Sequence, residues 1–288
     1  MRPFALLAAF VLVLGAAAAP AASLTIESVD IPSLAAGPRD RPPPPLLPGI
    51  LYMPPAATPI AAMIVAVSSG CVVQAREPYY ARALAREGIA GLVLDSCAPR
   101  GVASTVDDQT RLTGWEVEQD AWAALAFLAR DPRIDPARIG VMGVSKGGGA
   151  ALGTALLVRR RWLGDRRPDV AFAAHVPIVP GCTARHRDAR TTGAPILFML
   201  GGADDYAPAA ACLPYAEAIR AAGNGRVDVK LYEGAHHGWE VQGDAPRLLP
   251  RAENYSRCGT IVEDDGAHTA VATGERIAPR AFFAWARQ

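Results

Sequence analysis

Apolar residues along the chain follow two alternating patterns. Short, nearly continuous apolar runs are typical of strands buried on both faces, whereas apolar residues spaced three or four apart are typical of amphipathic helices. The helical pattern is clearest over residues 77–87, where Gly88 ends it, and over residues 116–130. The runs that we expect to form strands are residues 24–31, 49–53, 61–68, 89–95, 138–144, 171–179, 195–200 and 227–232.

This alternation of strands and helices predicts an α/β fold, with a mostly parallel sheet of about eight strands and helices on both faces. No internal repeat and no second apolar core interrupts the pattern, so we expect residues 23–288 to form one domain. A last helix is predicted over residues 277–287. The run of four prolines at 42–45 is interpreted as a stiff surface loop.

The first residues have the composition of an export signal. Arg2 gives a positive start, residues 4–14 are apolar, and 16–18 are alanines, as at a cleavage site. We therefore expect residues 1–22 to be a signal peptide cleaved near Ala18. The apolar stretch is short for a membrane span. The mature protein is accordingly expected to be periplasmic or secreted, without stable membrane association.

The charge of the chain is balanced, with Lys+Arg 29 and Asp+Glu 28. The densest basic positions, 159–161 and 166–167, are interpreted as the solvated end of a helix. Since no long basic stripe is present, we expect no nucleic acid partner.

The five cysteines all lie after the predicted cleavage site, where an oxidising compartment favours disulfides. An odd number leaves at least one thiol free. Cys182 follows one predicted strand and Cys212 follows the next, so this pair is the preferred disulfide. No two cysteines have the short C-x-x-C spacing typical of zinc ligands, and we expect no metal site.

Ser145 is the candidate nucleophile. It lies in Gly143-Val144-Ser145-Lys146-Gly147, directly after an expected strand and before a glycine-rich segment that opens a helix. This is the pattern of a nucleophile elbow, a sharp strand-to-helix turn that exposes a serine hydroxyl. The flanking glycines leave room where a Cβ would collide.

A serine hydroxyl needs a base to remove its proton and an acid to orient that base. Residues 201–206 and 233–239 each follow a predicted strand, and loops at the carboxyl ends of parallel strands meet at one edge of a sheet. The first loop contains Asp204 and Asp205, and the second contains His236 and His237. Spacing alone leaves both choices open.

These motifs resemble the dienelactone hydrolase family of α/β hydrolases, over about residues 45–288. Residues 201–208 read Gly-Gly-Ala-Asp-Asp-Tyr-Ala-Pro and match that family's acid loop, which selects Asp204. Residues 234–239 read Gly-Ala-His-His-Gly-Trp and match its base loop, which selects His237. The resemblance implies an α/β-hydrolase fold and a Ser-His-Asp triad that needs no cofactor.

The negative oxygen of the reaction intermediate requires fixed hydrogen-bond donors. We expect one to be the backbone N–H of Lys146, the residue after the nucleophile. By alignment with the family, the second is the N–H of Cys71, with Gly70 as the alternative. Ser69 stands where the family usually has histidine. The Lys146 side chain either has no role beyond its backbone or binds a charged group of the substrate.

Together these features predict an exported serine hydrolase, similar to carboxylesterases, that cleaves a small or medium ester through an acyl-enzyme. The founding dienelactone hydrolases use cysteine where this chain has Ser145, so their substrate is not carried over. One alternative is a peptidase of the prolyl-oligopeptidase type, although the chain is too short to include a propeller domain. The other is a non-catalytic binding protein with the same fold.

Overall fold

The computed structural model describes residues 23–37, 40–183, 185–223 and 225–241, and beyond them the backbone of four two-residue strands. The expected signal peptide at 1–22 and the expected helix at 277–287 lie outside the described residues. Among the described helices, none has both the length and the apolar character that crossing a membrane requires.

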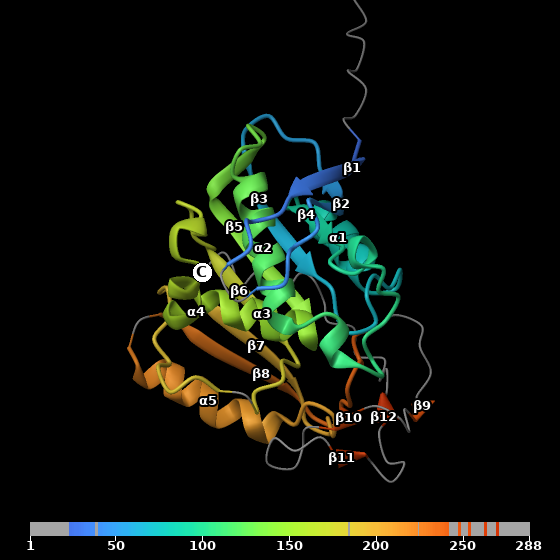
Figure 1. Cartoon of the computed structure of the whole chain (residues 1–288), viewed down its shortest axis with the longest axis vertical. Coiled ribbons are helices and arrows are strands. Elements are labelled where there is room, and N and C mark those ends of the chain that lie inside the picture. The colour runs from blue at the N-terminus through green and yellow to red at the C-terminus, as the bar shows by residue number, and fades with distance from the viewer. Residues whose placement is uncertain are drawn as a thin grey trace, which may run out of the picture.

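The central sheet has eight strands in the order β1-β2-β4-β3-β5-β6-β7-β8 (Figure 1). Strand β2 pairs antiparallel with β1 and with β4, and all other neighbours are parallel. This mostly parallel sheet confirms the predicted fold class. The strands are β1 (Thr25–Pro32), β2 (Leu46–Met53), β3 (Ile60–Ala66), β4 (Ala90–Leu94), β5 (Ile134–Val144), β6 (Ala174–Ile178), β7 (Ile196–Gly201) and β8 (Val227–Tyr232).

The helices lie between these strands along the chain, as the alternating pattern predicts. The α-helices are α1 (Glu77–Arg86), α2 (Gly114–Leu128), α3 (Lys146–Ala155), α4 (Leu157–Trp162) and α5 (Ala209–Ala221). Three 3₁₀ turns are η1 (Ala98–Arg100), η2 (Gln109–Arg111) and η3 (Gly164–Arg166). The short strands β9 (Arg247–Leu248), β10 (Glu253–Asn254), β11 (Val262–Glu263) and β12 (Thr269–Ala270) form two small two-stranded sheets.

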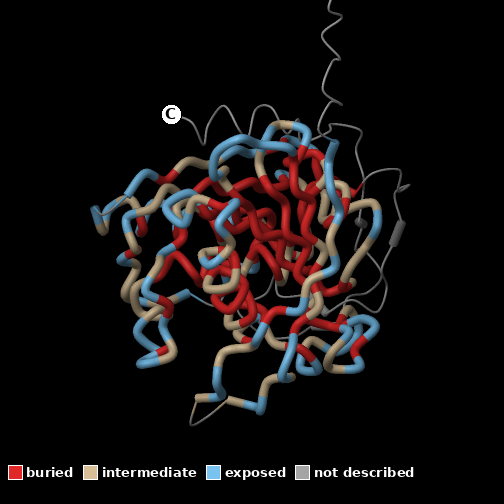
Figure 2. Tube along the Cα trace, turned by 90° about the horizontal axis from the view of Figure 1, so that it is seen from above, coloured by how far each residue is buried: buried red, intermediate tan, exposed pale blue. Residues whose placement is uncertain are grey.

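The two faces of the sheet carry alternate residues of the same strands, as the two-residue period of a strand requires. On one face Ile64 and Val141 pack in a cluster with α2 and with α3. On the other face Val65 and Met142 pack with α1. Buried residues fill the centre of the molecule between these helical layers (Figure 2).

Helix α2 shows how local sequence sets an element's start. Its N-cap is Thr113, whose hydroxyl accepts a hydrogen bond from the N–H of Glu116, while the Glu116 carboxylate accepts one from the N–H of Thr113. This capping box satisfies backbone donors that a helix end otherwise leaves free. The helix therefore begins at Gly114, two positions before the predicted start at 116. The segment leading into it reaches the site described next.

Candidate active site

Ser145 forms the whole of the turn between β5 and α3. Its backbone has φ 55° and ψ −113°, outside the regions that residues with a side chain favour. Two backbone hydrogen bonds hold the turn. The Ser145 N–H donates to the backbone carbonyl oxygen of Ile178 at 2.9 Å, and the Gly149 N–H donates to the backbone carbonyl oxygen of Ser145 at 2.8 Å. The turn thus has the geometry of the predicted elbow.

The glycines around Ser145 are required by close backbone packing. A Cβ on Gly143 would lie 2.5 Å from the carbonyl carbon of Gly147. A Cβ on Gly147 would lie 2.5 Å from the Ala66 oxygen at the end of β3. The first turn of α3 therefore rests directly on the backbone of the sheet.

Asp204 and His237 are brought together from the loops after β7 and β8. Nδ1 of His237 lies 2.9 Å from Oδ2 of Asp204, whose side chain is fully buried. The other carboxylate oxygen accepts hydrogen bonds from the N–H groups of Tyr206 at 3.0 Å and Ala207 at 2.7 Å. Three hydrogen bonds thus fix the carboxylate and, through it, the orientation of the imidazole ring.

The carboxylate sets the protonation of His237. Burial alone would lower the pKa of the imidazole, but the charge and the hydrogen bond of Asp204 outweigh it and raise that pKa above its ordinary value. A charged imidazole beside a buried carboxylate is favoured because the two groups neutralise each other.

A cavity of about 390 Å³ opens beside the nucleophile. Ser145, Ser69, Lys146 and Tyr206 are among its lining residues. The Tyr206 ring packs against the His237 ring with centroids 4.7 Å apart, so the imidazole lies next to the cavity wall. Among the described residues no hydrogen bond joins Ser145 to His237, and no cluster of three metal-ligating side chains occurs.

In the loop after β3, the backbone N–H groups of Cys71 and Gly70, which we expected to be oxyanion donors, make hydrogen bonds to Ser68 instead. The N–H of Cys71 donates to the backbone carbonyl oxygen of Ser68 at 3.0 Å. The N–H of Gly70 donates to the Ser68 hydroxyl at 3.3 Å. Both donors are thus engaged within the loop, and neither Cys71 nor Gly70 lines the cavity. Ser69 does line it, and its N–H makes no hydrogen bond within the described part of the chain. Of the three residues, Ser69 is therefore the one whose N–H is left available beside the cavity.

The sequence profile of the Dienelactone hydrolase family matches residues 49–260. The chain belongs to this family. The match confirms the resemblance drawn from the motifs and, with it, the expected enzyme class, a hydrolase of ester bonds. Among curated proteins, none matches the chain.

Solved structures of family members and esterases share the fold. A protein assigned as a dienelactone hydrolase from Klebsiella pneumoniae is 18% identical, with a TM-score of 0.59 over 77% of this chain and 91% of that one. Esterase 2 of Thermogutta terrifontis, phosphorylated by paraoxon, is 19% identical, with a TM-score of 0.56 over 78% of this chain and 87% of that one. Its butyrate-bound form is 18% identical, with a TM-score of 0.57 over the same shares.

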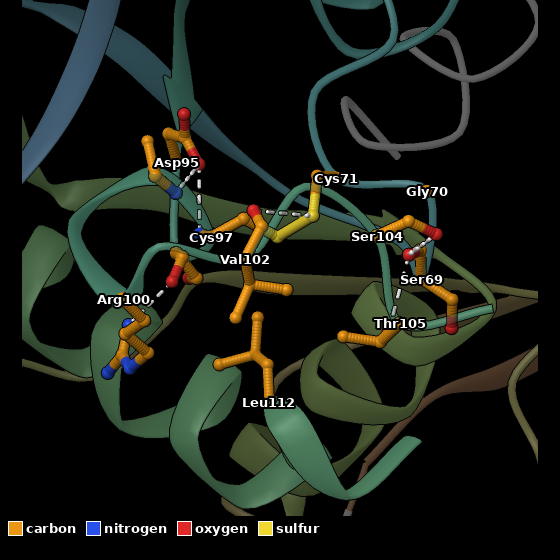
Figure 3. Close-up of a disulfide and its surroundings, with 12 residues drawn as sticks. Ser69, Gly70, Cys71, Asp95, Cys97, Arg100, Val102, Ser104, Thr105 and Leu112 are labelled. Atoms are coloured by element: carbon orange, nitrogen blue, oxygen red, sulfur yellow. Dashed lines mark hydrogen bonds between the residues drawn. A yellow bond between two sulfur atoms is a disulfide. The ribbon is translucent and has the colours of Figure 1, made fainter. Parts of the chain in front are cut away.

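Two disulfides border the site of this family member. Cys182, which lines the cavity, is bonded to Cys212 of α5, the pair preferred from the sequence. The second bond joins Cys71 to Cys97 and was not predicted (Figure 3). A signal for it was present, because these two cysteines follow β3 and β4, which are neighbouring parallel strands. Cys258 lies outside the described residues.

A buried ion pair, which no sequence motif predicts, connects the loop after β3 to the histidine loop. Glu240, three positions after His237, is fully buried, and its carboxylate lies 2.9 Å from Nε of Arg76. Arg76 also donates to the hydroxyl of Ser68. The guanidinium therefore holds together two segments that carry proposed site residues, Ser69 and His237.

The packing of α3 on β3 predicts opposite effects at two neighbouring glycines. Gly147→Ala should lower the free energy of unfolding by about 1–3 kcal/mol, because its Cβ would overlap the Ala66 oxygen. Gly149→Ala should raise it by roughly 0.5–1 kcal/mol, since a Cβ there meets open space and alanine favours a helix. Urea unfolding with the disulfides intact measures both changes, and equal effects at the two positions would contradict this account of the turn.

Proposed function

We propose that this protein is a serine carboxylesterase that hydrolyses a small or medium ester. The observation that carries the proposal is the hydrogen bond between His237 and Asp204 at the edge of the sheet where the strained Ser145 turn opens on a cavity. A nucleophile on a sharp turn, an orienting acid and a base, in this order along the chain, are the parts of an α/β-hydrolase triad.

In this mechanism Ser145 attacks the ester carbonyl while Nε2 of His237 takes the hydroxyl proton. Asp204 holds the other ring nitrogen and stabilises the imidazolium that forms. The imidazolium then gives its proton to the departing alcohol, and water releases the acyl group from Ser145 through the same base. Hydrogen bonds between nucleophile and base are often long before substrate binds and shorten in the complex, so the mechanism requires His237 to reach Ser145 when the ester is present.

The oxyanion that forms during attack needs two donors in this scheme. The N–H of Lys146 is suited because Lys146 begins α3, so its N–H has no acceptor in a preceding helical turn and lies at the positive end of the helix dipole. The N–H of Ser69 is suited because it is free of other hydrogen bonds among the described residues and belongs to a residue that lines the same cavity. Fixed donors of this kind stabilise the transition state without having to reorganise.

The size of the proposed substrate is supported by the cavity and by a structural neighbour. A cavity of about 390 Å³ is in the lower part of the range for small-molecule sites. Esterase 2 of Thermogutta terrifontis has been solved with propionate and with butyrate bound. Short acyl chains are therefore the first substrates to test on this chain.

We also propose that the protein is exported and acts in the periplasm or outside the cell, after cleavage of residues 1–22. Two disulfides, Cys71–Cys97 and Cys182–Cys212, support this location because such bonds persist mainly in oxidising compartments.

Removal of the nucleophile should abolish turnover while leaving the fold intact. Ser145→Ala is expected to reduce kcat/KM for p-nitrophenyl butyrate by about a thousandfold or more, because the covalent step is lost. A fluorophosphonate should label Ser145 in the wild type, as located by mass spectrometry, and should leave the variant unlabelled. Full turnover by a correctly folded Ser145→Ala protein would remove the assignment, as would labelling at another serine.

The acid limb of the pH profile should follow the protonation of His237. Protonated imidazole cannot accept the serine proton, so kcat/KM should fall as pH drops through a pKa above the usual value near 6.5. Asp204→Asn removes the charge that raises this pKa, and the limb should then move to lower pH with a plateau reduced by orders of magnitude.

The neighbouring aspartate provides the control for this change. Asp205→Asn should leave the acid limb in place, since it is the Asp204 carboxylate that bonds to His237. A shift caused by Asp205→Asn, with none caused by Asp204→Asn, would assign the acid to the other residue.

A further inference from the structure

The Lys146 side chain holds one wall of the cavity. Nζ lies 2.6 Å from Oγ1 of Thr105 and 3.4 Å from the backbone carbonyl oxygen of Gln109. It also donates to the backbone carbonyl oxygen of Leu112. All three acceptors belong to the segment of residues 102–113, which we call the wall segment. Gln109 and Thr113 of this segment line the cavity.

The chemistry of an ammonium group fits these three acceptors. The chain contains 27 arginines and only two lysines, Lys146 and Lys230, so lysine at this position is an exception in a chain that otherwise uses arginine. An ammonium has three protons around one small atom, whereas a guanidinium is a planar fork. Burial lowers the pKa of Lys146 to about 8, which leaves the group mainly protonated at pH 7. Each proton then has one acceptor.

The same segment is also bonded to the loop that contains Ser69. The backbone carbonyl oxygen of Ser69 accepts two hydrogen bonds from Thr105, one from its N–H at 2.7 Å and one from the Thr105 hydroxyl at 3.3 Å (Figure 3). The Ser69 hydroxyl in turn donates to Oε1 of Gln109 at 3.0 Å. Thr105 therefore connects the ammonium of Lys146 with the peptide unit that follows Ser69.

We propose that the Lys146 side chain is a positioning residue, which fixes the wall segment and through Thr105 orients Ser69, and that the cavity consequently accepts esters with uncharged acyl groups. The second part follows because Lys146 is the one charged residue among the described residues that line the cavity, and its ammonium is occupied by the wall. No lining cation is left to pair with a substrate carboxylate. The inference rests on the proposed esterase function and makes it more specific.

Amide hydrogen exchange tests the positioning role without using activity. In Lys146→Met, which keeps the length of the side chain and removes its donors, the amides of residues 102–113 should exchange at least tenfold faster than in the wild type. Lys230→Met is the matched control, since Lys230 is exposed on β8 and lies over the Tyr232 ring. It should leave exchange in the wall segment unchanged. Unchanged exchange in folded Lys146→Met protein would overturn the proposal.

Thr105→Val provides a second variant in case Lys146→Met folds poorly. Valine has nearly the same shape and removes both the acceptor for Lys146 and the hydroxyl bond to Ser69. Faster exchange in residues 102–113 is expected here too, by a smaller factor because two acceptors of Lys146 remain. Exchange equal to that of the wild type would count against the connection through Thr105.

A pair of esters tests the substrate class. Mono-p-nitrophenyl succinate carries a carboxylate, and p-nitrophenyl 4-methylpentanoate carries an isopropyl group of similar shape in its place. The wild type should have at least a tenfold higher kcat/KM for the neutral ester at pH 7. Lys146→Met should reduce kcat/KM for both esters by the same factor, mainly through kcat, because the oxyanion donor and not a substrate contact is disturbed.

The outcomes separate this inference from the function on which it rests. A loss confined to the succinate ester would make Lys146 a binder of substrate anions and would overturn the proposal. Equal activity of wild type and Lys146→Met on both esters would also overturn it, while leaving the esterase function standing. If the wild type hydrolyses neither ester and does not react with a fluorophosphonate, the proposed function itself is wrong, and the exchange experiment still decides whether Lys146 holds the wall.

Discussion

The backbone of Ser145 is the constraint on which the rest of the site depends. A residue in such a sparsely populated conformation costs of order 1–3 kcal/mol, so the surrounding structure has to stabilise it. Stabilisation comes from the hydrogen bonds to Ile178 and Gly149 and from the close packing of α3 on the ends of β3 and β6. Since the loops after β3, β7 and β8 end at this same edge, the turn also decides which residues can reach the serine hydroxyl.

The parts of the structure that sequence could predict are those set by local pattern. Strand β8 has the predicted bounds of 227–232, because apolar residues alternating with Asp228 and Lys230 are followed directly by the turn residues Glu233 and Gly234. Strand β5 begins at Ile134, four residues before the predicted start at 138, since its first residues include the exposed Pro136. An exposed proline at a strand start resembles a loop in the sequence, although it is tolerated there.

The parts that sequence could not predict depend on side-chain directions and on contacts between distant segments. Asp204 and Asp205 are neighbours, so spacing cannot choose between them, and the family motif was needed to select the residue that bonds to His237. Sequence also could not show that the backbone of residues 68–71 folds back on itself, with Cys71 at φ 59°, so that the N–H of Cys71 is engaged within its own loop. The pairing of Arg76 with Glu240 follows only from the tertiary fold.

The two disulfides connect the geometry of the site with the proposed location of the protein. Cys71–Cys97 ties the loop of Ser69 to the end of β4, and Cys182–Cys212 ties a cavity residue to α5. Donors that stabilise an oxyanion are effective only when they are already fixed in place. The Cys71–Cys97 bond restrains the loop that carries the Ser69 N–H, and the Cys182–Cys212 bond restrains a residue of the cavity lining. The geometry proposed for catalysis therefore relies on an oxidising environment, and export is what would place the chain in one.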